Sequence, residues 1–342
     1  MSEQNRNIIH GNESTLQMPD WQNQLANAIK DPEELLKRLQ LDKKLLASMQ
    51  IGDQLFPLRV TESYLSRIKL GDSKDPLLRQ ILPIHEESAE IPGYANDPVG
   101  DKQAEKAPGL IHKYHGRVLL TLTGACGIHC RYCFRRHFDY SNSNPGKQHF
   151  PLVLDYIKND ASLFEVILSG GDPLSLNDQR LQTLTSQLDD IEHIKIIRIH
   201  TRQVIVLPDR VNQQLLDWLN KLQSKAVMVI HVNHPNEIDD NVSLALLKLK
   251  KAGVELLNQS VLLSGVNDDP STLVSLSLKL FENDVRPYYI HLLDKARGTA
   301  HFDVEESQAL KILDEVRKRL PGYLVPGLTR ETAKEPYKTP IW

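Results

Sequence analysis

The sequence contains very little cysteine. Cys126, Cys130 and Cys133 are the only three among 342 residues, and they lie within one short window. Because no other cysteine exists to pair with them, this composition excludes a framework of disulfide bridges. Clustered free thiols are typical of a reduced, cytoplasmic protein, and there they favour a metal or redox role.

Long apolar runs and an excess of charge of one sign are also absent. No stretch approaches the ~18 apolar residues of a membrane span, and the N-terminal segment lacks the apolar core of a secretory signal. The 44 acidic and 41 basic residues give a formal net charge of −3, so the composition favours neither a membrane nor a nucleic acid as a partner. With 40% hydrophobic and 25% charged residues, the chain has the composition of an ordinary globular protein.

Residues 1–109 predict a helical N-terminal region followed by a linker. Asp31–Pro32 and Asp75–Pro76 each combine an N-cap residue with a proline at the first helical position, which is typical of a helix start. The stretch 91–109 is rich in proline, glycine and charged residues and predicts a connection rather than a helix or a strand. We therefore expect a domain boundary there.

Residues 110–330 predict a barrel core, and residues 331–342 predict a separate C-terminal segment. In the core, short β-rich runs alternate with amphipathic helical patterns, and successive strands begin roughly 30 residues apart, which is the length of one βα unit. Six such units indicate an α/β fold, a partial (β/α)6 barrel rather than an eight-unit one. The expected strands are Arg117–Thr123, Phe164–Ser169, Ile194–His200, Ala226–Val232, Val254–Leu263 and Arg286–Leu293.

Polar residues stand at or after the ends of these strands. Because the carboxyl ends of parallel strands build the active site in such folds, we expect these residues to surround one cavity. They comprise the cysteine loop after the first strand, Ser169-Gly170-Gly171-Asp172 after the second, His200-Thr201-Arg202 after the third, His231 after the fourth, Gln259 within the fifth and Asp294 at the end of the sixth.

The three cysteines follow the spacing C-x3-C-x2-C. Three thiolates from one loop can hold three corners of a cubane iron–sulfur cluster, and without a fourth cysteine one iron keeps an open position for another ligand. A zinc site of three cysteines and one histidine is the alternative, completed by His129 or His137. The spacing alone leaves both possibilities open.

The motif C-x3-C-x-aromatic-C, with Tyr132 as its aromatic residue, resembles that of the radical S-adenosylmethionine superfamily. Further segments make the chain, from about residue 75 to its C-terminus, resemble the lysine 2,3-aminomutase family. These segments are His112–Leu120, Cys133–Arg136, Ser169–Pro173, His231–Glu237, Gln259–Leu263 with Gly265–Asp268, and Lys338–Pro340.

The resemblance implies three cofactors. A [4Fe–4S] cluster is expected on Cys126, Cys130 and Cys133, and its open iron is expected to bind S-adenosyl-L-methionine. Lys338 is the expected catalytic residue, which binds pyridoxal 5'-phosphate covalently. The family places Gly170-Gly171-Asp172 at the methionine amino group, where glycines allow a close backbone approach and an acid accepts from an ammonium. The other expected cofactor-binding residues are Lys113, Tyr114 and Arg117 at the phosphate of pyridoxal phosphate, together with Tyr132, Ser169, His231 and Gln259.

The resemblance also implies L-lysine as the substrate. Arg135 matches the arginine that binds the α-carboxylate, and Asp294 and Glu331 match two acids that hold the ε-ammonium. Two carboxylates facing one ammonium discriminate against uncharged side chains. Two positions depart from the usual family pattern, since Lys113 stands in place of an arginine and Glu331 in place of an aspartate.

The expected activity is that of an isomerase that converts L-lysine into (R)-β-lysine by moving the 2-amino group to carbon 3, with an external electron donor. The chain ends at Trp342, shortly after Pro340, and in this it is similar to the elongation factor P type of the family, whose β-lysine is attached to that factor by a dedicated ligase. Three alternatives remain. They are the same reaction on arginine or glutamate, a radical protein without an amino acid product, and a zinc-stabilised binding module.

Overall fold

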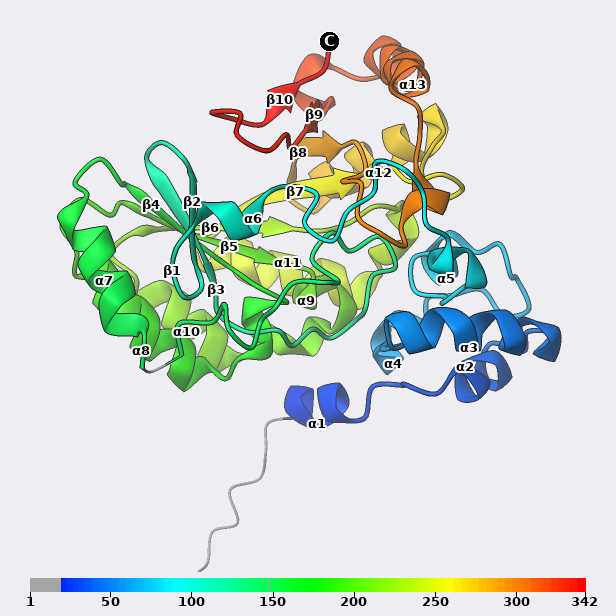
Figure 1. Ribbon diagram of the computed structural model, residues 1–342, viewed down its shortest axis with the longest axis horizontal. Helices are drawn as coiled ribbons and strands as arrows, with labels where there is room; N and C mark the ends of the chain where they lie inside the picture. Colours follow the sequence, from blue (N-terminus) through cyan, green and yellow to red (C-terminus); the bar gives the residue numbers. More distant parts are fainter. Residues whose placement is uncertain (1–19, 147) are drawn as a thin grey trace, which may run out of the picture.

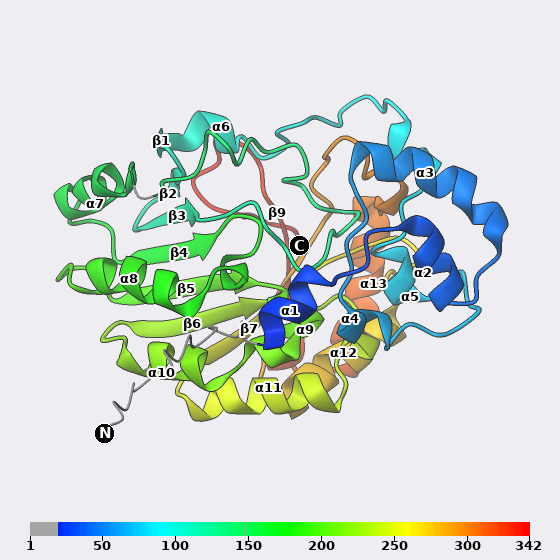
Figure 2. The ribbon, with the colours of Figure 1, turned by 90° about the horizontal axis from the view of Figure 1, so that it is seen from below.

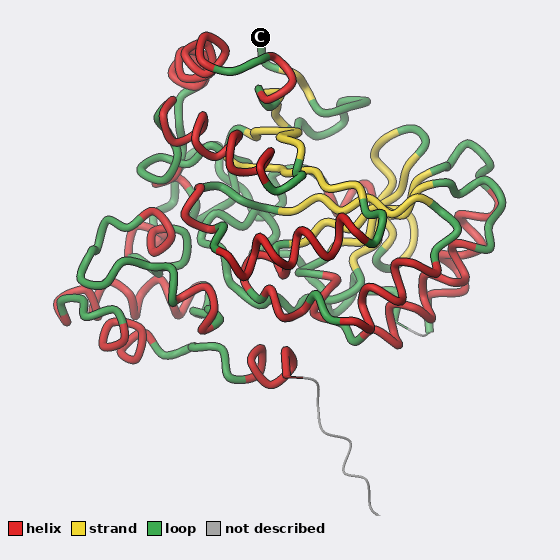
Figure 3. Tube along the Cα trace, turned by 180° about the vertical axis from the view of Figure 1, so that it is seen from behind, coloured by secondary structure: helices red, strands yellow, loops and turns green. Residues whose placement is uncertain are grey.

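The computed structural model describes residues 20–146 and 148–342. Within these residues, ten strands form one sheet whose spatial order follows the sequence order from β1 to β10 (Figure 1). The strands form an inner layer, and the helices lie outside it (Figure 3). None of the helices in this described part of the chain has the length and apolar character that a membrane crossing requires.

Neighbouring strands from β3 to β9 run parallel to one another. The six strands expected from the sequence correspond to β3–β8, and helices follow these strands, which confirms an α/β fold with a partial barrel. The bounds are β3 Arg117–Thr121, β4 Glu165–Ser169, β5 Ile196–Thr201, β6 Lys225–Ile230, β7 Glu255–Val261, β8 Arg286–His291 and β9 Gly327–Arg330.

The sequence pattern does not predict β9. Its four residues are too few to show an alternation of apolar and polar side chains. They become a strand because their backbone pairs with β8, with Leu328 opposite Ile290 and Thr329 opposite His291. Pairing of this kind depends on tertiary position rather than on local propensity.

The helices outside the sheet bury their apolar stripes against it. Leu168 and Ile199 of the sheet belong to one apolar core with Leu181 and Leu246 of the helices, and all four side chains are fully buried. Truncating such a side chain to alanine costs about 2–5 kcal/mol, so this core determines where the strand ends lie. The helices are α7 Phe150–Asn159, α8 Asp178–Asp189, α9 Gln203–Val206, α10 Gln213–Lys221, α11 Asp240–Lys251, α12 Pro270–Glu282 and α13 Glu306–Arg319.

The N-terminal helices form a second layer beside the barrel (Figure 2). Both expected helix starts are confirmed, because Asp31 accepts a hydrogen bond from the backbone nitrogen of Glu33, and Asp75 accepts from those of Leu77 and Leu78. The helices are α1 Asp20–Ala26, α2 Pro32–Arg38, α3 Leu46–Leu55, α4 Glu62–Leu65 and α5 Pro76–Arg79. Their apolar core also contains Ile128, Val206 and Leu207 of the barrel.

The segment 91–109, expected to be a plain connection, contains a short helix and a strand near its end. Helix α6 spans Asp101–Ala104, and β1 spans Glu105–Ala107. Strand β1 pairs antiparallel with β2 (Leu110–Tyr114), which itself pairs antiparallel with β3. At the other edge of the sheet, β10 (Thr339–Pro340) pairs antiparallel with β9.

Short 3-10 turns complete the described structure. They are η1 Lys43–Leu45, η2 His85–Ser88, η3 Pro173–Ser175, η4 Pro208–Arg210, η5 Pro235–Glu237, η6 Ala300–Phe302 and η7 Gly322–Leu324.

Candidate active site

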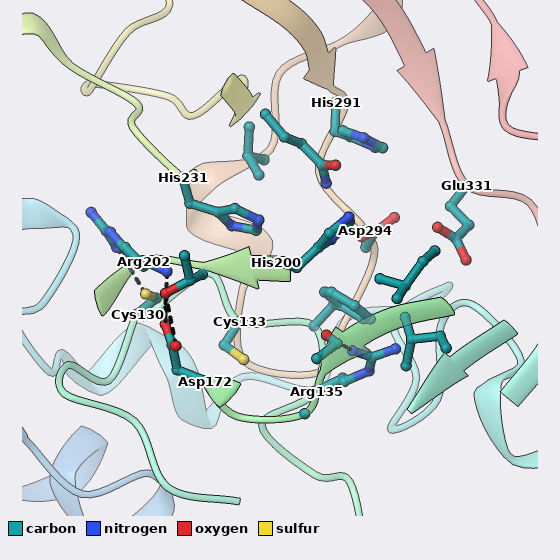
Figure 4. Close-up of a pocket in the computed structure, with 18 of the residues that line it drawn as sticks. Cys130, Cys133, Arg135, Asp172, His200, Arg202, His231, His291, Asp294 and Glu331 are labelled. Carbon is teal, nitrogen blue, oxygen red and sulfur yellow. Dashed lines mark hydrogen bonds between the residues drawn. The ribbon is translucent and has the colours of Figure 1, made fainter. Parts of the chain in front are cut away.

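A cavity of about 440 Å³ lies at the carboxyl ends of the parallel strands. Its walls come from the loops that follow β3, β4, β5 and β6, from the ends of β7 and β8, and from the C-terminal segment (Figure 4). Every residue expected from the sequence to bind a cofactor or the substrate lines this one cavity. These residues are Lys113, Tyr114, Arg117, Cys126, Cys130, Tyr132, Cys133, Arg135, Ser169, Gly170, Gly171, Asp172, His231, Gln259, Asp294, Glu331 and Lys338.

The N-terminal region braces the cysteine loop. Arg131, in the centre of that loop, is fully buried, and its Nε and Nη2 atoms donate to the two carboxylate oxygens of Glu87 at 2.8 and 2.6 Å. Its other hydrogen bonds go to the carbonyl oxygens of Phe56 and Gly52 at 2.6 and 3.0 Å. Because a buried guanidinium is tolerable only when its charge and its donors are matched, this arrangement fixes the backbone of the loop.

The two histidines that could complete a zinc site are turned to backbone carbonyls. His129 Nδ1 lies 2.7 Å from the carbonyl oxygen of Pro57, and His137 Nε2 lies 3.2 Å from that of Arg297. Among residues 20–146 and 148–342, no group of three or more histidine, cysteine, aspartate or glutamate side chains is arranged to hold a single metal ion. The geometry therefore gives no support to the zinc alternative. Three thiols on one loop suit a cluster, in which each cysteine binds a separate iron.

The three thiols influence one another electrostatically. Burial raises the pKa of Cys126 well above its usual range, and the neighbouring Asp172, Cys133 and Cys130 raise it further. Burial also raises the pKa of Cys133 to about 11, with a contribution from Cys130. Such thiols stay protonated until a metal centre binds them, and binding then releases protons. The donor set fits an iron–sulfur cluster.

The glycine pair after β4 lies directly against the backbone that leads to the first cysteine. A Cβ atom on Gly170 would lie 2.5 Å from the carbonyl oxygen of Thr123, and one on Gly171 would lie 2.6 Å from that of Ala125. Gly170 also has a φ of 126°, which other residues rarely adopt. The close approach predicted for this pair is thus an approach of backbone to backbone, which holds the two loops together.

The side chain of Asp172 faces protein donors. Its Oδ1 accepts from Leu174 N at 3.0 Å and from the Thr201 hydroxyl at 2.8 Å, and its Oδ2 accepts from Arg202 N and Gln203 N at 2.7 and 2.9 Å. Burial raises the pKa of Asp172 to about 6. The carboxylate joins the loop after β4 to the end of β5, and a contact from Asp172 to a methionine ammonium stays a prediction.

Arg202, which follows β5, is the link between the cysteine loop and the barrel wall. Its Nη1 atom donates to Cys130 Sγ at 2.8 Å (Figure 4). The same Nη1 atom donates to the Tyr132 hydroxyl at 2.6 Å, and Nη2 donates to Glu237 Oε2 at 2.8 Å. The Tyr132 hydroxyl also accepts from Asn233 Nδ2 at 2.7 Å. Hydrogen bonds to cluster sulfurs are one of the means by which proteins set cluster potentials.

Alternating charges run along the other wall of the cavity. Arg135 Nε lies 2.7 Å from Asp101 Oδ2, and Lys113 Nζ lies 2.6 Å from Asp101 Oδ1 and 2.8 Å from Glu331 Oε1. Glu331 Oε2 lies 3.4 Å from Lys338 Nζ. Burial alone lowers the pKa of Lys113, but Glu331 and Asp101 outweigh it and raise that pKa overall. We name the residues Arg135, Asp101, Lys113, Glu331 and Lys338 the charge chain.

Lys338 reaches the cavity because the strand that begins at the next residue is paired to β9. Thr339 lies opposite Arg330 in that pairing. Burial lowers the pKa of Lys338, although Glu331 and Asp294 act to raise it. The Nζ atom lies 3.1 Å from Nε2 of His291, and burial lowers the pKa of His291 well below its usual range. The neutral imidazole therefore accepts a hydrogen bond from the lysine.

The groups around Lys338 fit pyridoxal phosphate. The Lys338 ammonium lies 5.9 Å from the ring centroid of Tyr289, so an aromatic surface stands beside the amine. The Arg117 guanidinium lies 4.8 Å from the ring centroid of Tyr114, and these side chains supply a cation and a hydroxyl of the kind that a phosphate requires. The amine of Lys113 instead holds two carboxylates in this structure, so its expected contact with the phosphate stays a prediction.

Asp294 lines this cavity and, unlike Asp172, has no network of side-chain hydrogen bonds within the described part of the chain to take the place of a counter-ion. Among the described residues its carboxyl group has no ion pair within 4.0 Å, unlike Glu331, which has two. Burial raises the pKa of Asp294 to about 7, and the charge of Glu331 adds to the rise. A buried carboxyl group of this kind ionises readily once a cation is placed beside it.

The wall near the cysteine loop carries neutral donors and acceptors. Nε2 of His231 is buried without a hydrogen-bond partner among the described residues, and burial lowers the pKa of His231 to about 4. Gln259 lines the same cavity. An unpaired polar atom aimed into a cavity is a group that a ligand can satisfy, so this wall fits a polar nucleoside such as that of S-adenosylmethionine.

Sequence reasoning does not select Asp101 or His291 as site residues, and it places Arg202 at the cavity without giving it a role. Asp101 lies in a segment whose composition predicts a loop, and no pattern there points to the cavity. His291 is the last residue of β8, and its position at a strand end is the signal by which it could have been found, as Arg202 was.

Comparisons with known proteins agree with the resemblance, although no family model matches the chain. The chain is 45% identical over 324 residues to the L-lysine 2,3-aminomutase of Escherichia coli (strain K12), and the match covers 94% of each protein. It is 43% identical over 320 residues to the L-lysine 2,3-aminomutase of Haemophilus influenzae, covering 94% of this chain and 95% of the relative.

More distant relatives carry the same name. The L-lysine 2,3-aminomutase of Clostridium subterminale is 36% identical over 323 residues, which are 94% of this chain and 77% of that protein. Identity at these levels, over nearly the whole chain and together with a cavity that gathers all the expected residues, confirms what the motifs indicate. The chain belongs to the L-lysine 2,3-aminomutase family.

Proposed function

We propose that this protein is an isomerase that converts L-lysine into (R)-β-lysine and depends on a [4Fe–4S] cluster, S-adenosyl-L-methionine and pyridoxal 5'-phosphate. The observation that carries the proposal is the division of one cavity into two ends. Three free cysteines lie at one end, and the charge chain with its lysine lies at the other.

The cysteine end suits the initiation of a radical reaction. Cys126, Cys130 and Cys133 would hold the cluster, and the wall with His231 and Gln259 would hold S-adenosylmethionine. When bound, these groups supply a radical that removes a hydrogen atom from the substrate, and pyridoxal phosphate supplies the conjugated system through which the amino group moves. An external electron donor, which we also propose, reduces the cluster.

The other end suits an amino acid with a basic side chain. Arg135 offers a guanidinium to the α-carboxylate, and Asp294 and Glu331 offer carboxylates to the ε-ammonium. Of these two acids, Asp294 has no ion pair among the described residues, so it is the stronger candidate for the contact with the substrate. Burial of these groups excludes water from the space in which the radical forms.

We further propose that the β-lysine is supplied for attachment to elongation factor P by a dedicated ligase. The proposal is supported by the match to the relatives from E. coli and H. influenzae, which covers 94% and 95% of those proteins, against 77% of the relative from C. subterminale. The free cysteines are in keeping with a reducing, cytoplasmic location, which is part of the same proposal.

The test is a turnover assay with protein reconstituted anaerobically with iron, sulfide and pyridoxal phosphate. L-lysine labelled with ¹⁵N at the α-amino group is incubated with S-adenosylmethionine and a chemical reductant, and the product is analysed by mass spectrometry and NMR. We expect the label to move to carbon 3. L-arginine and L-glutamate, each labelled in the same way, are run beside it and should give no product.

Two other outcomes have distinct meanings. Formation of 5'-deoxyadenosine with the nitrogen label unmoved would identify a radical protein without aminomutase activity. Migration only in arginine or glutamate would keep the reaction and refute the assignment of the substrate.

A further inference from the structure

Asp101 is a buried acid to which neither the sequence motifs nor the proposed reaction assigns a role. It is 2% exposed and is the first residue of α6. Asp97 accepts hydrogen bonds from the backbone nitrogens of Asp101 and Lys102 and so satisfies the start of the helix. The carboxylate of Asp101 is therefore not needed as a cap, and it lines the active-site cavity.

The carboxylate of Asp101 is shared between two cations. Oδ2 lies 2.7 Å from Nε of Arg135, and Oδ1 lies 2.6 Å from Nζ of Lys113. Burial acts to raise the pKa of Asp101, but Arg135 and Lys113 outweigh it and lower that pKa. The group is thus an anion between the expected carboxylate-binding arginine and the rest of the charge chain.

The contacts of Arg135 leave one edge of its guanidinium for a ligand. A guanidinium has five N–H donors. The Nε donor is used by Asp101, and Nη1 donates to the Ser169 hydroxyl at 3.1 Å. Phe134 and Phe138 place their rings 4.9 and 5.8 Å from the guanidinium carbon, which limits rotation. Both Nη2 donors and one Nη1 donor remain, and one donor on each of these two nitrogens forms the pair that a carboxylate binds in bidentate fashion.

We propose that Asp101 is a positioning residue for the substrate, which orients Arg135 so that its Nη edge faces the α-carboxylate and, through Lys113, holds Glu331 in place. This inference rests on the proposed function. Because the Asp101 carboxylate acts on substrate binding rather than on the transfer of the amino group, its loss weakens the affinity for lysine more than it slows the conversion of bound lysine.

The main variant is Asp101→Asn, with Glu105→Gln as a matched control. Glu105 lies close by in β1 and accepts from Gly109 N and the Ser143 hydroxyl, outside the residues that line the cavity. For Asp101→Asn, we expect both the KM for lysine and the lysine dissociation constant, measured by calorimetry on protein with bound pyridoxal phosphate, to rise roughly tenfold, as expected for loss of one charge-assisted hydrogen bond. The kcat per bound cluster should stay within about threefold.

Asp101→Glu restores the charge and should recover most of the affinity, whereas Glu105→Gln should bind lysine as the wild type does. A purely structural role would lower the fraction of protein with cluster and the apparent kcat while leaving KM and the dissociation constant unchanged. That result, or wild-type affinity in Asp101→Asn, overturns the proposal.

The single variant leaves Lys113 without one of its anions and for that reason could fail to fold. The double variant Asp101→Asn with Lys113→Met removes both charges together, which avoids an unpaired buried cation. It should bind lysine roughly tenfold more weakly than Lys113→Met does, because Arg135 still lacks the carboxylate that orients it. An equal affinity for lysine in the double variant and in Lys113→Met would contradict the inference. A wild-type protein that neither binds nor converts lysine refutes the proposed function instead.

Discussion

Lys113 and Glu331 form an ion pair of 2.8 Å inside the cavity, and at these two site positions the resemblance leads us to expect an arginine and an aspartate instead. At each position the departure changes the length of a side chain. A lysine stands where an arginine is usual, and a glutamate, longer by one methylene, stands where an aspartate is usual. From this contact we expect the two differences to compensate each other and to place the Glu331 carboxylate.

This relationship predicts non-additive effects of restoring the usual residues. Glu331→Asp withdraws the carboxylate from Lys113 and should lower kcat/KM for lysine roughly tenfold, because a buried charged hydrogen bond is lost. Lys113→Arg places a larger cation against an unchanged acid and should have a similar effect. In the double variant, the decrease in log kcat/KM for lysine should be at most half of the sum of the two single-variant decreases. A decrease equal to that sum would show that the two positions are independent.

A second prediction concerns Lys338, the lysine that we expect to bind pyridoxal phosphate. Lys338→Ala should abolish the covalent attachment of pyridoxal phosphate, measured as the mass added to the intact protein after borohydride reduction. Lys334→Ala is the matched control, because Lys334 lies in the same segment and is exposed. That variant should keep the added mass. An adduct retained in Lys338→Ala would assign the role to another lysine.

A third prediction follows from the raised pKa of Asp294, which is about 7 instead of the model-compound value of 3.8. The folded protein favours the protonated carboxyl, so the stability from this group is fully present below about pH 4 and is lost as the pH rises towards 7. The variant Asp294→Asn cannot ionise. We measure the free energy of unfolding with urea in protein free of cofactor and substrate. The value for Asp294→Asn minus the value for the wild type should increase between pH 4 and pH 7, by up to about 4 kcal/mol.

The comparison should be made at pH 4.5 and pH 7.5, and it needs only the difference between the two proteins at each pH. A difference that is the same at both values would show that Asp294 titrates normally in the folded state.

A fourth prediction tests the contact between the two cavity loops. In Gly171→Ala the new methyl group would meet the carbonyl oxygen of Ala125 at 2.6 Å, so the backbone before Cys126 must move, at a cost of about 1–3 kcal/mol. We expect reconstituted Gly171→Ala to retain clearly less iron and sulfide than the wild type. Gly322→Ala, where no atom lies within 4 Å of the new methyl group, should retain a full complement. Equal iron content in the two variants would mean that the loops can separate without loss of the cluster site.

Much of the fold could be predicted because its strands are long and regularly spaced. Val166–Leu168 and their neighbours are buried on both faces of a parallel sheet and so form continuous apolar runs, and the residues after such strands must meet at one edge. That rule predicts that the cysteine loop and Asp294 lie at the same cavity.

The remaining features depend on tertiary contacts that leave no local pattern. Strands β9 and β10 are short and exist only through pairing with each other and with β8. Asp101 lies in a stretch whose glycine and proline content predicts a loop, and only the position of α6 against β2 turns its carboxylate towards Arg135. The internal bonds of Asp172 likewise depend on where β5 ends.

Ile128, between the first two cysteines, is buried in the same apolar core as Leu35 and Tyr64 of the N-terminal helices. The floor of the cysteine loop is therefore supplied by a part of the chain that contributes no strand to the barrel. The cysteine loop and the N-terminal helices should unfold as one cooperative unit. The rate of amide exchange in α2 should therefore report on whether the cysteine loop is folded. A barrel fragment without those helices should fail to retain iron under conditions in which its β-sheet is still folded.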